Sequence, residues 1–223
     1  MILLIDTSTM LGLCALAQKS SSGDYKVLYE KHISAELSHS EKLFIGIKDA
    51  LDACGINFDS VKKVVYCSGP GSFTGLRISY SAVKGFFVAK GLEPFGVSTL
   101  KALLKSYKSK DRSVMCAIMA SGKQEFFAYA LSASGLEQKI KEGCYTQEKL
   151  LKLLFDLKKE GVVCIGQGAL AIKDKLTEMG IVVPDEAQDH IVNAKGMLCL
   201  LEDDRVDGIN YLKASYAEQR RKN

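Results

Sequence analysis

Residues 68–91 read SGPGSFTGLRISYSAVKGFFVAKG and join a short apolar run to a longer segment with helical spacing. A glycine-rich turn between a strand and a helix can hold an anion, or it can let two backbone segments approach closely. No lysine occupies the position of a Walker lysine, and Pro70 stands where a GxSxG nucleophile motif needs its first glycine. The turn alone therefore indicates a close backbone approach, with Ser72 or Thr74 as the N-cap of the helix.

The helix that follows, expected over 74–90, carries small residues at spacings of 4, 3, 3 and 4, which favour one face. They are Gly75, Ser79, Ala82, Gly85 and Ala89. A mid-helix glycine such as Gly85 costs about 1 kcal/mol relative to alanine. A face of small residues lets another element approach closely. That element is the protein's own sheet, a helix of another chain, or both, since a helix has two sides.

Around this stretch the sequence predicts two α/β units in tandem. Strands are expected over 1–6, 11–18, 26–33, 61–67 and 94–97, with helices over 41–54 and 74–90. After a polar segment, strands over 113–119, 125–131 and 162–165 and helices over 147–160, from 169 and over 191–202 loosely repeat this order. Two tandem lobes of mixed sheet flanked by helices are the layout of the actin-like ATPase (ASKHA, ribonuclease H-like) fold. We expect an N-terminal lobe over 1–103 and a smaller, divergent C-terminal lobe over 104–223.

The composition indicates a globular cytoplasmic protein. Hydrophobic residues make up 47% of the chain and charged residues 25%, and no apolar run is long enough to cross a membrane. The seven cysteines are widely spaced without a CxxC, which predicts free thiols in a reducing compartment. The net charge of +4 is mild, and the basic cluster at 220–222 does not by itself indicate a nucleic-acid groove.

Two turns are candidates for a nucleotide site. Residues 6–9 (DTST) close the first predicted strand, where actin-like ATPases meet phosphate and metal; the alternative is that these side chains bond to their own turn. Residues 166–169 (GQGA) also join a strand to a helix, where those ATPases meet adenosine. The candidate residues of such a vestigial ATP or ADP site are Asp6, Ser8, Thr9, Gly71, Ser72 and Gly168.

No catalytic or metal centre can be picked out from the sequence. The three histidines, His32, His39 and His190, do not form an HExxH or another metal-binding spacing, and we expect them to be structural or exposed. A Ser/His/Asp set or a paired-carboxylate motif is not recognisable either. We therefore expect no catalytic residue, no metal ligand and no cofactor, with the weak nucleotide site as the open alternative.

Three motifs together resemble the TsaB (YeaZ) family, the dimerisation subunit of the bacterial tRNA threonylcarbamoyladenosine machinery. They are ILLIDTS at 2–8, ELSHSEKLF at 36–44 and SGPGSFTGLRIS at 68–79, the last followed by AxKGxxxAxG. The match is dense over 1–103 and thin beyond. In the second half, AIMAS at 117–121 and INYLK at 209–213 depart from the family's AIDAR and PxYLR patterns.

The resemblance implies a pseudo-enzyme that binds and activates the catalytic subunit TsaD, which transfers threonylcarbamoyl to the adenosine next to the anticodon of tRNA. The two histidines of TsaD's HxxxH-type metal motif would fall on Thr99 and Leu103, and neither side chain replaces imidazole. An older family label, glycoprotease, would need the same site. The resemblance implies TsaE as a further ATPase partner, tRNA contact only through the complex, and a homodimer without TsaD. The alternative is an actin-like ATPase or phosphotransferase in its own right.

The resemblance also implies where TsaD binds. In the family, the two helices after the meander form a helix bundle with TsaD, and here they are the helices expected over 41–54 and 74–90. The interface residues expected on them are Leu43, Phe44, Ile47, Leu51, Gly75, Ser79, Ala82, Val83, Gly85, Phe86 and Ala89.

Overall fold

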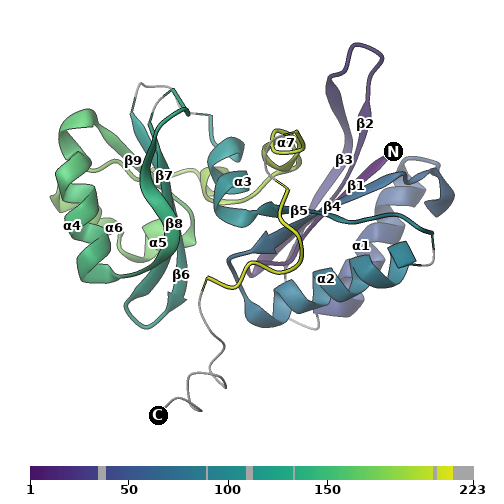
Figure 1. The fold of residues 1–223 in the computed structure, drawn as a ribbon, viewed down its shortest axis with the longest axis horizontal. Helices are drawn as coiled ribbons and strands as arrows, with labels where there is room; N and C mark the ends of the chain where they lie inside the picture. Colours follow the sequence, from purple (N-terminus) through teal and green to yellow (C-terminus); the bar gives the residue numbers. More distant parts are fainter. Residues whose placement is uncertain (35–38, 89, 109–112, 133, 203–204, 213–223) are drawn as a thin grey trace. The chain divides into compact units, whose positions relative to one another are not determined.

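The computed structural model describes residues 1–34, 39–88, 90–108, 113–132, 134–202 and 205–212, without the side chains of 39, 40 and 86–88. The chain divides into two compact units, coloured along the sequence in Figure 1. The first unit is Met1–Ala102 with Val192–Asn210, and the second is Leu103–Ile191 with Tyr211 and Leu212. Both units are mixed α/β structures, as the sequence predicts.

The first unit is built on a five-stranded sheet with the order β3-β2-β1-β4-β5. The strands β1 (Ile2–Asp6), β2 (Leu11–Lys19) and β3 (Tyr25–Ser34) form the expected antiparallel meander. The strands β4 (Lys63–Gly69) and β5 (Phe95–Ser98) add parallel to β1. Parallel strands need crossover connections, and the helix between β4 and β5 is one of them.

Helices cover both faces of this sheet. On one face, α1 (His39–Ala53) and α2 (Phe73–Val88) pack on a core that includes Leu3, Leu16 and Val64. The residues that alternate with these, such as Leu4 and Val65, are also fully buried. Below the strands, α1 and α2 run side by side in Figure 1, and α7 (Ala194–Leu198) packs on β2 and β3. The short helix α3 (Thr99–Ser106) follows β5 directly.

The second unit repeats the order of the first. Its sheet runs β8-β7-β6-β9, with β6 (Val114–Gly122), β7 (Glu125–Leu131) and β8 (Gln138–Thr146) antiparallel and β9 (Val162–Ile165) parallel to β6. This is the same arrangement as β3-β2-β1-β4, so the predicted internal repeat is confirmed. The helices are α4 (Gln147–Leu157), α5 (Gln167–Ala171) and α6 (Lys173–Glu178).

Two features differ from the sequence-based expectation. The edge strand β8 was not predicted, because Ile140 is the only residue of its nine that is fully buried and apolar. The helix expected over 191–202 is the shorter α7, and Val192–Asn210 groups with the first unit instead of with 104–191. Two hydrogen bonds hold this segment against β3 of the first unit. His32 Nε2 bonds the carbonyl oxygen of Val192 at 3.0 Å, and Ala194 N donates to Glu30 Oε1 at 3.2 Å.

Two further features concern the cysteines and the lengths of the helices. All seven cysteines are free thiols, and Cys14, Cys67, Cys116 and Cys164 are buried. Over the described part of the chain, every helix is too short or too polar to cross a membrane.

Candidate functional site

The glycines of the 69–75 loop hold the start of α2 against the turn between β1 and β2. A Cβ on Gly71 would lie 2.4 Å from the Ser8 carbonyl oxygen, and one on Gly75 would lie 1.9 Å from that of Thr7. Both distances are shorter than any real contact, so the loop needs glycine at these positions. Two hydrogen bonds close the approach: Ser72 N donates to the Ser8 carbonyl oxygen, and Thr7 Oγ1 to that of Gly75, each at 2.7 Å. The glycine-rich turn therefore serves a close backbone approach.

The N-cap and the end of the neighbouring helix also follow the sequence. Ser72 Oγ accepts from Gly75 N at 3.2 Å, so Ser72 is the N-cap of α2. Gly55, with φ of +63°, follows the end of α1 in the left-handed conformation that is common just after a helix.

The 6–9 turn bonds to itself. Ser8 N donates to Asp6 Oδ1 at 2.8 Å, and Thr9 Oγ1 donates to the Leu11 carbonyl oxygen at 2.8 Å. Asp6 is 2% exposed, and burial raises the pKa of its carboxyl group above 3.8. The hollow beside it, which Asp6, Thr7 and Lys42 help to line, measures about 10 Å³, room for about one water. The structure brings Asp6, Ser8, Gly71 and Ser72 together in a packed turn.

The last candidate nucleotide residue, Gly168, belongs to the second unit. There α5 packs directly on β6, since a Cβ on Gly168 would lie 2.8 Å from the Ile118 side chain. Gly166, the first residue of this turn, has φ of +98° and donates its N–H to His190 Nδ1 at 3.0 Å. Because Nδ1 accepts this bond, the proton of the neutral ring lies on Nε2, which donates to the Pro184 carbonyl oxygen at 2.8 Å. His190 is therefore a buried structural residue, as expected.

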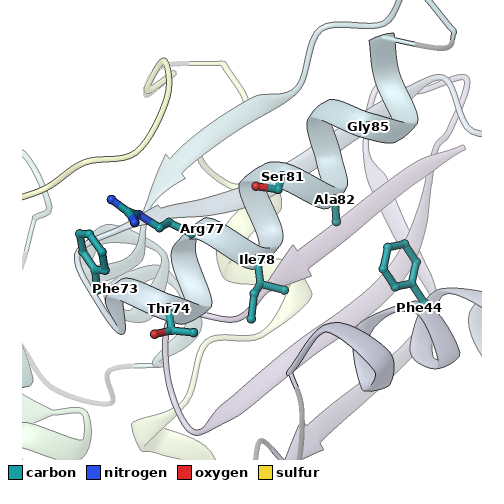
Figure 2. Close-up of a pocket in the computed structure, with 8 residues that line it drawn as sticks. All are labelled: Phe44, Phe73, Thr74, Arg77, Ile78, Ser81, Ala82 and Gly85. Atoms are coloured by element: carbon teal, nitrogen blue, oxygen red, sulfur yellow. The ribbon is translucent and has the colours of Figure 1, made fainter.

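An apolar groove lies between α1 and α2. It has a volume of about 830 Å³. Figure 2 shows Phe44 from α1 on one side and the groove-facing residues of α2 on the other. The lining residues are Phe44, Phe73, Thr74, Arg77, Ile78, Ser81, Ala82 and Gly85.

The two ends of the groove differ in chemistry. At the start of α2, the Arg77 guanidinium lies 3.9 Å from the centre of the Phe73 ring, a cation–π contact. Toward the other end, a Cβ on Gly85 would meet no atom of the described residues within 4 Å, so the space above this helix residue is open with respect to them. The groove therefore has a positively charged end and an open apolar end.

The structure divides the interface residues expected from the sequence into two groups. Phe44, Ala82 and Gly85 line the groove, and Leu51 is half-buried. Five others are buried in the unit's own core: Leu43, Ile47, Gly75, Ser79 and Val83. Ala89 and the side chain of Phe86 lie outside the described residues.

The reason for this division is the angular width of the small-residue stripe. At about 100° per residue, positions 75 and 79 point into the core of the unit, whereas positions 82 and 85 are rotated away from it toward α1. The expectation missed the groove residues Phe73, Thr74, Arg77, Ile78 and Ser81. In the sequence, positions 74, 78, 82 and 85 form a second stripe at helical spacing, which lies beside the stripe of small residues used for the prediction.

The positions matched to the TsaD metal motif are part of the core. Thr99 is fully buried and Leu103 is 3% exposed. Within the described ranges, His, Cys, Asp and Glu residues do not gather in any group of three that could hold a metal ion. His32 bonds a backbone carbonyl, as given above, and the side chain of His39 lies outside the described residues.

Comparison with known proteins agrees with the motifs. The family model of TsaD, tRNA N6-adenosine threonylcarbamoyltransferase, matches residues 33–182. The tRNA threonylcarbamoyladenosine biosynthesis protein TsaB of Buchnera aphidicola (subsp. Schizaphis graminum) is 31% identical over 53% of this chain and 55% of its own length. The protein of the same name from Escherichia coli K12 is 28% identical over 66% of this chain and 65% of its own. The chain thus spans between half and two thirds of these curated relatives.

Solved structures agree on the fold. A Pseudomonas aeruginosa protein described as similar to the peptidase YeaZ superposes with a TM-score of 0.72, at 20% identity, over 95% of this chain and 99% of that one. YeaZ from Pseudomonas aeruginosa gives 0.67, at 21% identity, over 89% of each chain. The expected fold, two actin-like α/β units, is confirmed. The chain therefore belongs to the family that the TsaD model describes, and within it to the TsaB (YeaZ) branch.

Proposed function

We propose that this chain acts in the biosynthesis of tRNA threonylcarbamoyladenosine as the non-catalytic partner of a TsaD-like subunit. The observation that carries the proposal is the apolar groove of about 830 Å³ between α1 and α2. It lies on the two helices that the family resemblance assigns to the TsaD contact. Phe44 is 47% exposed in this groove, and covering it with a partner would remove apolar surface from water.

The shape of the groove suits a helix of the partner. Small side chains allow two helix axes to come within about 8–10 Å. Ala82 and Gly85 supply such a surface on α2, and Gly85 has open space above it. Phe44 and Ile78 flank this low surface with bulk. A second copy of this chain would compete for the same groove, which is the expected homodimer.

The core positions of Thr99 and Leu103 support a non-catalytic role. Leucine has no donor atom, and a neutral threonine hydroxyl is a poor metal ligand. In the proposed assembly the metal-dependent transfer of threonylcarbamoyl belongs to the TsaD-like subunit. A TsaE-like ATPase and tRNA would join through the complex.

The internal bonds of the 6–9 turn favour this role over the alternative of an actin-like ATPase. The Thr7 hydroxyl and the amides of Ser8 and Ser72, which could otherwise meet phosphate, are hydrogen-bonded within the unit. Weak binding of ATP or ADP stays a prediction. Titration calorimetry of the chain with ATP and Mg²⁺ tests it, and the alternative requires micromolar binding that Asp6→Ala abolishes.

The experiment that tests the proposed function is a tRNA modification assay that contains tRNA, an activated threonylcarbamoyl donor and the TsaD-like and TsaE-like proteins of the same organism. We expect threonylcarbamoyladenosine to form only when this chain is added. Gly85→Glu should remove that activity because a charged side chain would fill the open end of the groove, whereas Gly85→Ala should keep it. Modification at the same rate without the chain would contradict the proposal.

A further inference from the structure

The segment 205–210, here named the C-terminal strap, lies along the edge of the first sheet. Val206 forms an antiparallel bridge with Gly96 of β5, and its N–H donates to the Gly96 carbonyl oxygen at 2.8 Å. Asn210 N donates to the carbonyl oxygen of Ser68, near the end of β4, also at 2.8 Å. In Figure 1 this is the yellow segment that passes β5 after α7. The strap therefore contacts both parallel strands next to the loop that begins α2.

Two glycines make room for the strap. A Cβ on Gly96 would lie 2.2 Å from the Val206 carbonyl oxygen, and one on Gly69 would lie 2.7 Å from that of Asn210. From the sheet side, Tyr66 Oη donates to the Gly208 carbonyl oxygen at 2.8 Å. The strap is thus seated by backbone contacts at positions where a side chain on the sheet would displace it.

Surface charges add little to this seat. Arg205 pairs with Glu93 and Asp207 at 2.8 Å each, but both carboxylates are about four-fifths exposed. Exposed pairs of this kind contribute about 0–1 kcal/mol. The backbone hydrogen bonds and the contact with Tyr66 are therefore the main attachments of the strap.

The strap contacts the residues that determine where α2 begins. Gly69 ends β4, and α2 begins four residues later at Phe73. Asn210 contacts Gly69 and Ser68, while Ser8 contacts Gly71 and Ser72. The connecting loop is consequently held at two neighbouring places, by the 6–9 turn and by the strap. Of these two clamps, the strap comes from a distant part of the sequence.

We propose that the C-terminal strap is a positioning element for α2, which clamps the 69–72 loop and so sets the geometry of the α1–α2 groove. The clamp itself is a property of the isolated chain. Its effect on partner binding rests on the proposed function.

Hydrogen exchange in the variant Asn210→Pro tests the clamp. Proline removes the N–H that bonds Ser68, whereas the matched control Asn210→Ala keeps it. We expect the amides of Ser72 and Leu76, which are bonded at the start of α2, to exchange about tenfold faster in the proline variant than in the control. Amides of β6 and β7 in the second unit should not change. Exchange of Ser72 and Leu76 within twofold of the control would overturn the proposal.

A second variant covers the case in which proline disrupts the whole first unit. Tyr66→Phe removes the hydrogen bond to Gly208 but keeps the ring in the core. Faster exchange at Ser72 and Leu76, with the central strands β1 and β4 still protected, would support the clamp. Unchanged exchange at these two amides would overturn it.

Partner affinity separates the clamp from the proposed function. We expect Asn210→Pro to bind the TsaD-like subunit about tenfold more weakly than Asn210→Ala, although neither change touches the groove. If the amides of Asn210→Pro exchanged faster but both variants bound the TsaD-like subunit equally well, the claim that the strap sets the geometry of the groove would be wrong. If the unmodified chain fails to bind the TsaD-like subunit, the proposed function fails, and the exchange result still decides whether the strap positions α2.

Discussion

The two sides of α2 use small residues for opposite reasons. On the sheet side, Gly75 has the Thr7 carbonyl oxygen 1.9 Å from where its Cβ would be. On the groove side, Gly85 in the same helix has no atom of the described part of the chain within 4 Å of that position. The first glycine allows the chain to fold, whereas the second costs stability and leaves open space. A residue that weakens the isolated chain is most easily explained by a contact made with another molecule.

The largest effect is expected from Gly75→Ala. The added methyl group must push back the Thr7 backbone, which is held by the sheet, and overpacking of this kind costs about 1–3 kcal/mol or more. We expect the free energy of unfolding in urea to fall by about 3 kcal/mol, with loss of the Thr7–Gly75 hydrogen bond adding to the clash. If the free energy of unfolding of the variant stayed within about 0.5 kcal/mol of the original, the usual range for a surface substitution, the two backbones would not be in close contact.

The next largest effect concerns binding. Ala82→Glu places a charge in the apolar groove, and we expect its affinity for the TsaD-like subunit to fall by about 100-fold or more, because the charge would be buried without a partner. Its stability should change little, since the groove is open. Lys84→Glu is the control, because Lys84 is an exposed residue of α2 that does not line the groove. Equal binding by both variants, measured by calorimetry, would place the interface elsewhere.

A smaller effect of opposite sign is expected from Gly85→Ala. Alanine is the better helix former and meets no neighbour here, so the free energy of unfolding should rise by about 0.5–1 kcal/mol. Urea denaturation of Gly75→Ala and Gly85→Ala in one series compares the two sides of α2 directly. If Gly85→Ala destabilised the chain, the space above Gly85 would have to be occupied.

The smallest effect is confined to a pH window. Burial raises the pKa of Asp6 above 3.8, so the folded state binds this proton more tightly than the unfolded state. The stabilisation is fully present below pH 3.8 and is lost as the pH rises through the raised pKa of the folded state. Asp6→Asn, which keeps an oxygen for Ser8 N, should lack this part of the pH dependence. Parallel slopes of stability against pH from 4 to 8 for the two proteins would contradict it.

Much of the fold was predictable because it depends on local patterns. The apolar runs of the first two strands, the alternation of the third and the spacing in α1 and α2 placed those elements within two residues of their observed ends. The edge strand β8 was missed because an edge strand with one solvated face carries few apolar residues. The return of Val192–Asn210 to the first unit depends on long-range hydrogen bonds, which leave no periodic signal.

The candidate site was predictable only in part. The spacing of Gly75, Ser79, Ala82 and Gly85 pointed to α2, which lines the groove, and to a face of small residues. It could not show that the face straddles the border between sheet and groove, because that border depends on how α1 and the 6–9 turn pack against α2. Likewise, the sequence of the 69–75 loop allowed both an anion site and a close approach, and the distances to Thr7 and Ser8 decide between them in favour of the close approach.

The most direct test of the account compares two neighbouring residues of α1. Phe44 lines the groove and is 47% exposed, whereas Ile45 is 59% exposed and does not line it. Titration calorimetry would measure binding of the TsaD-like subunit to the original chain, Phe44→Glu and Ile45→Glu. We expect Ile45→Glu to bind like the original and Phe44→Glu to lose about 100-fold or more in affinity. Binding of Phe44→Glu with the original affinity would contradict the assignment of the groove as the partner site.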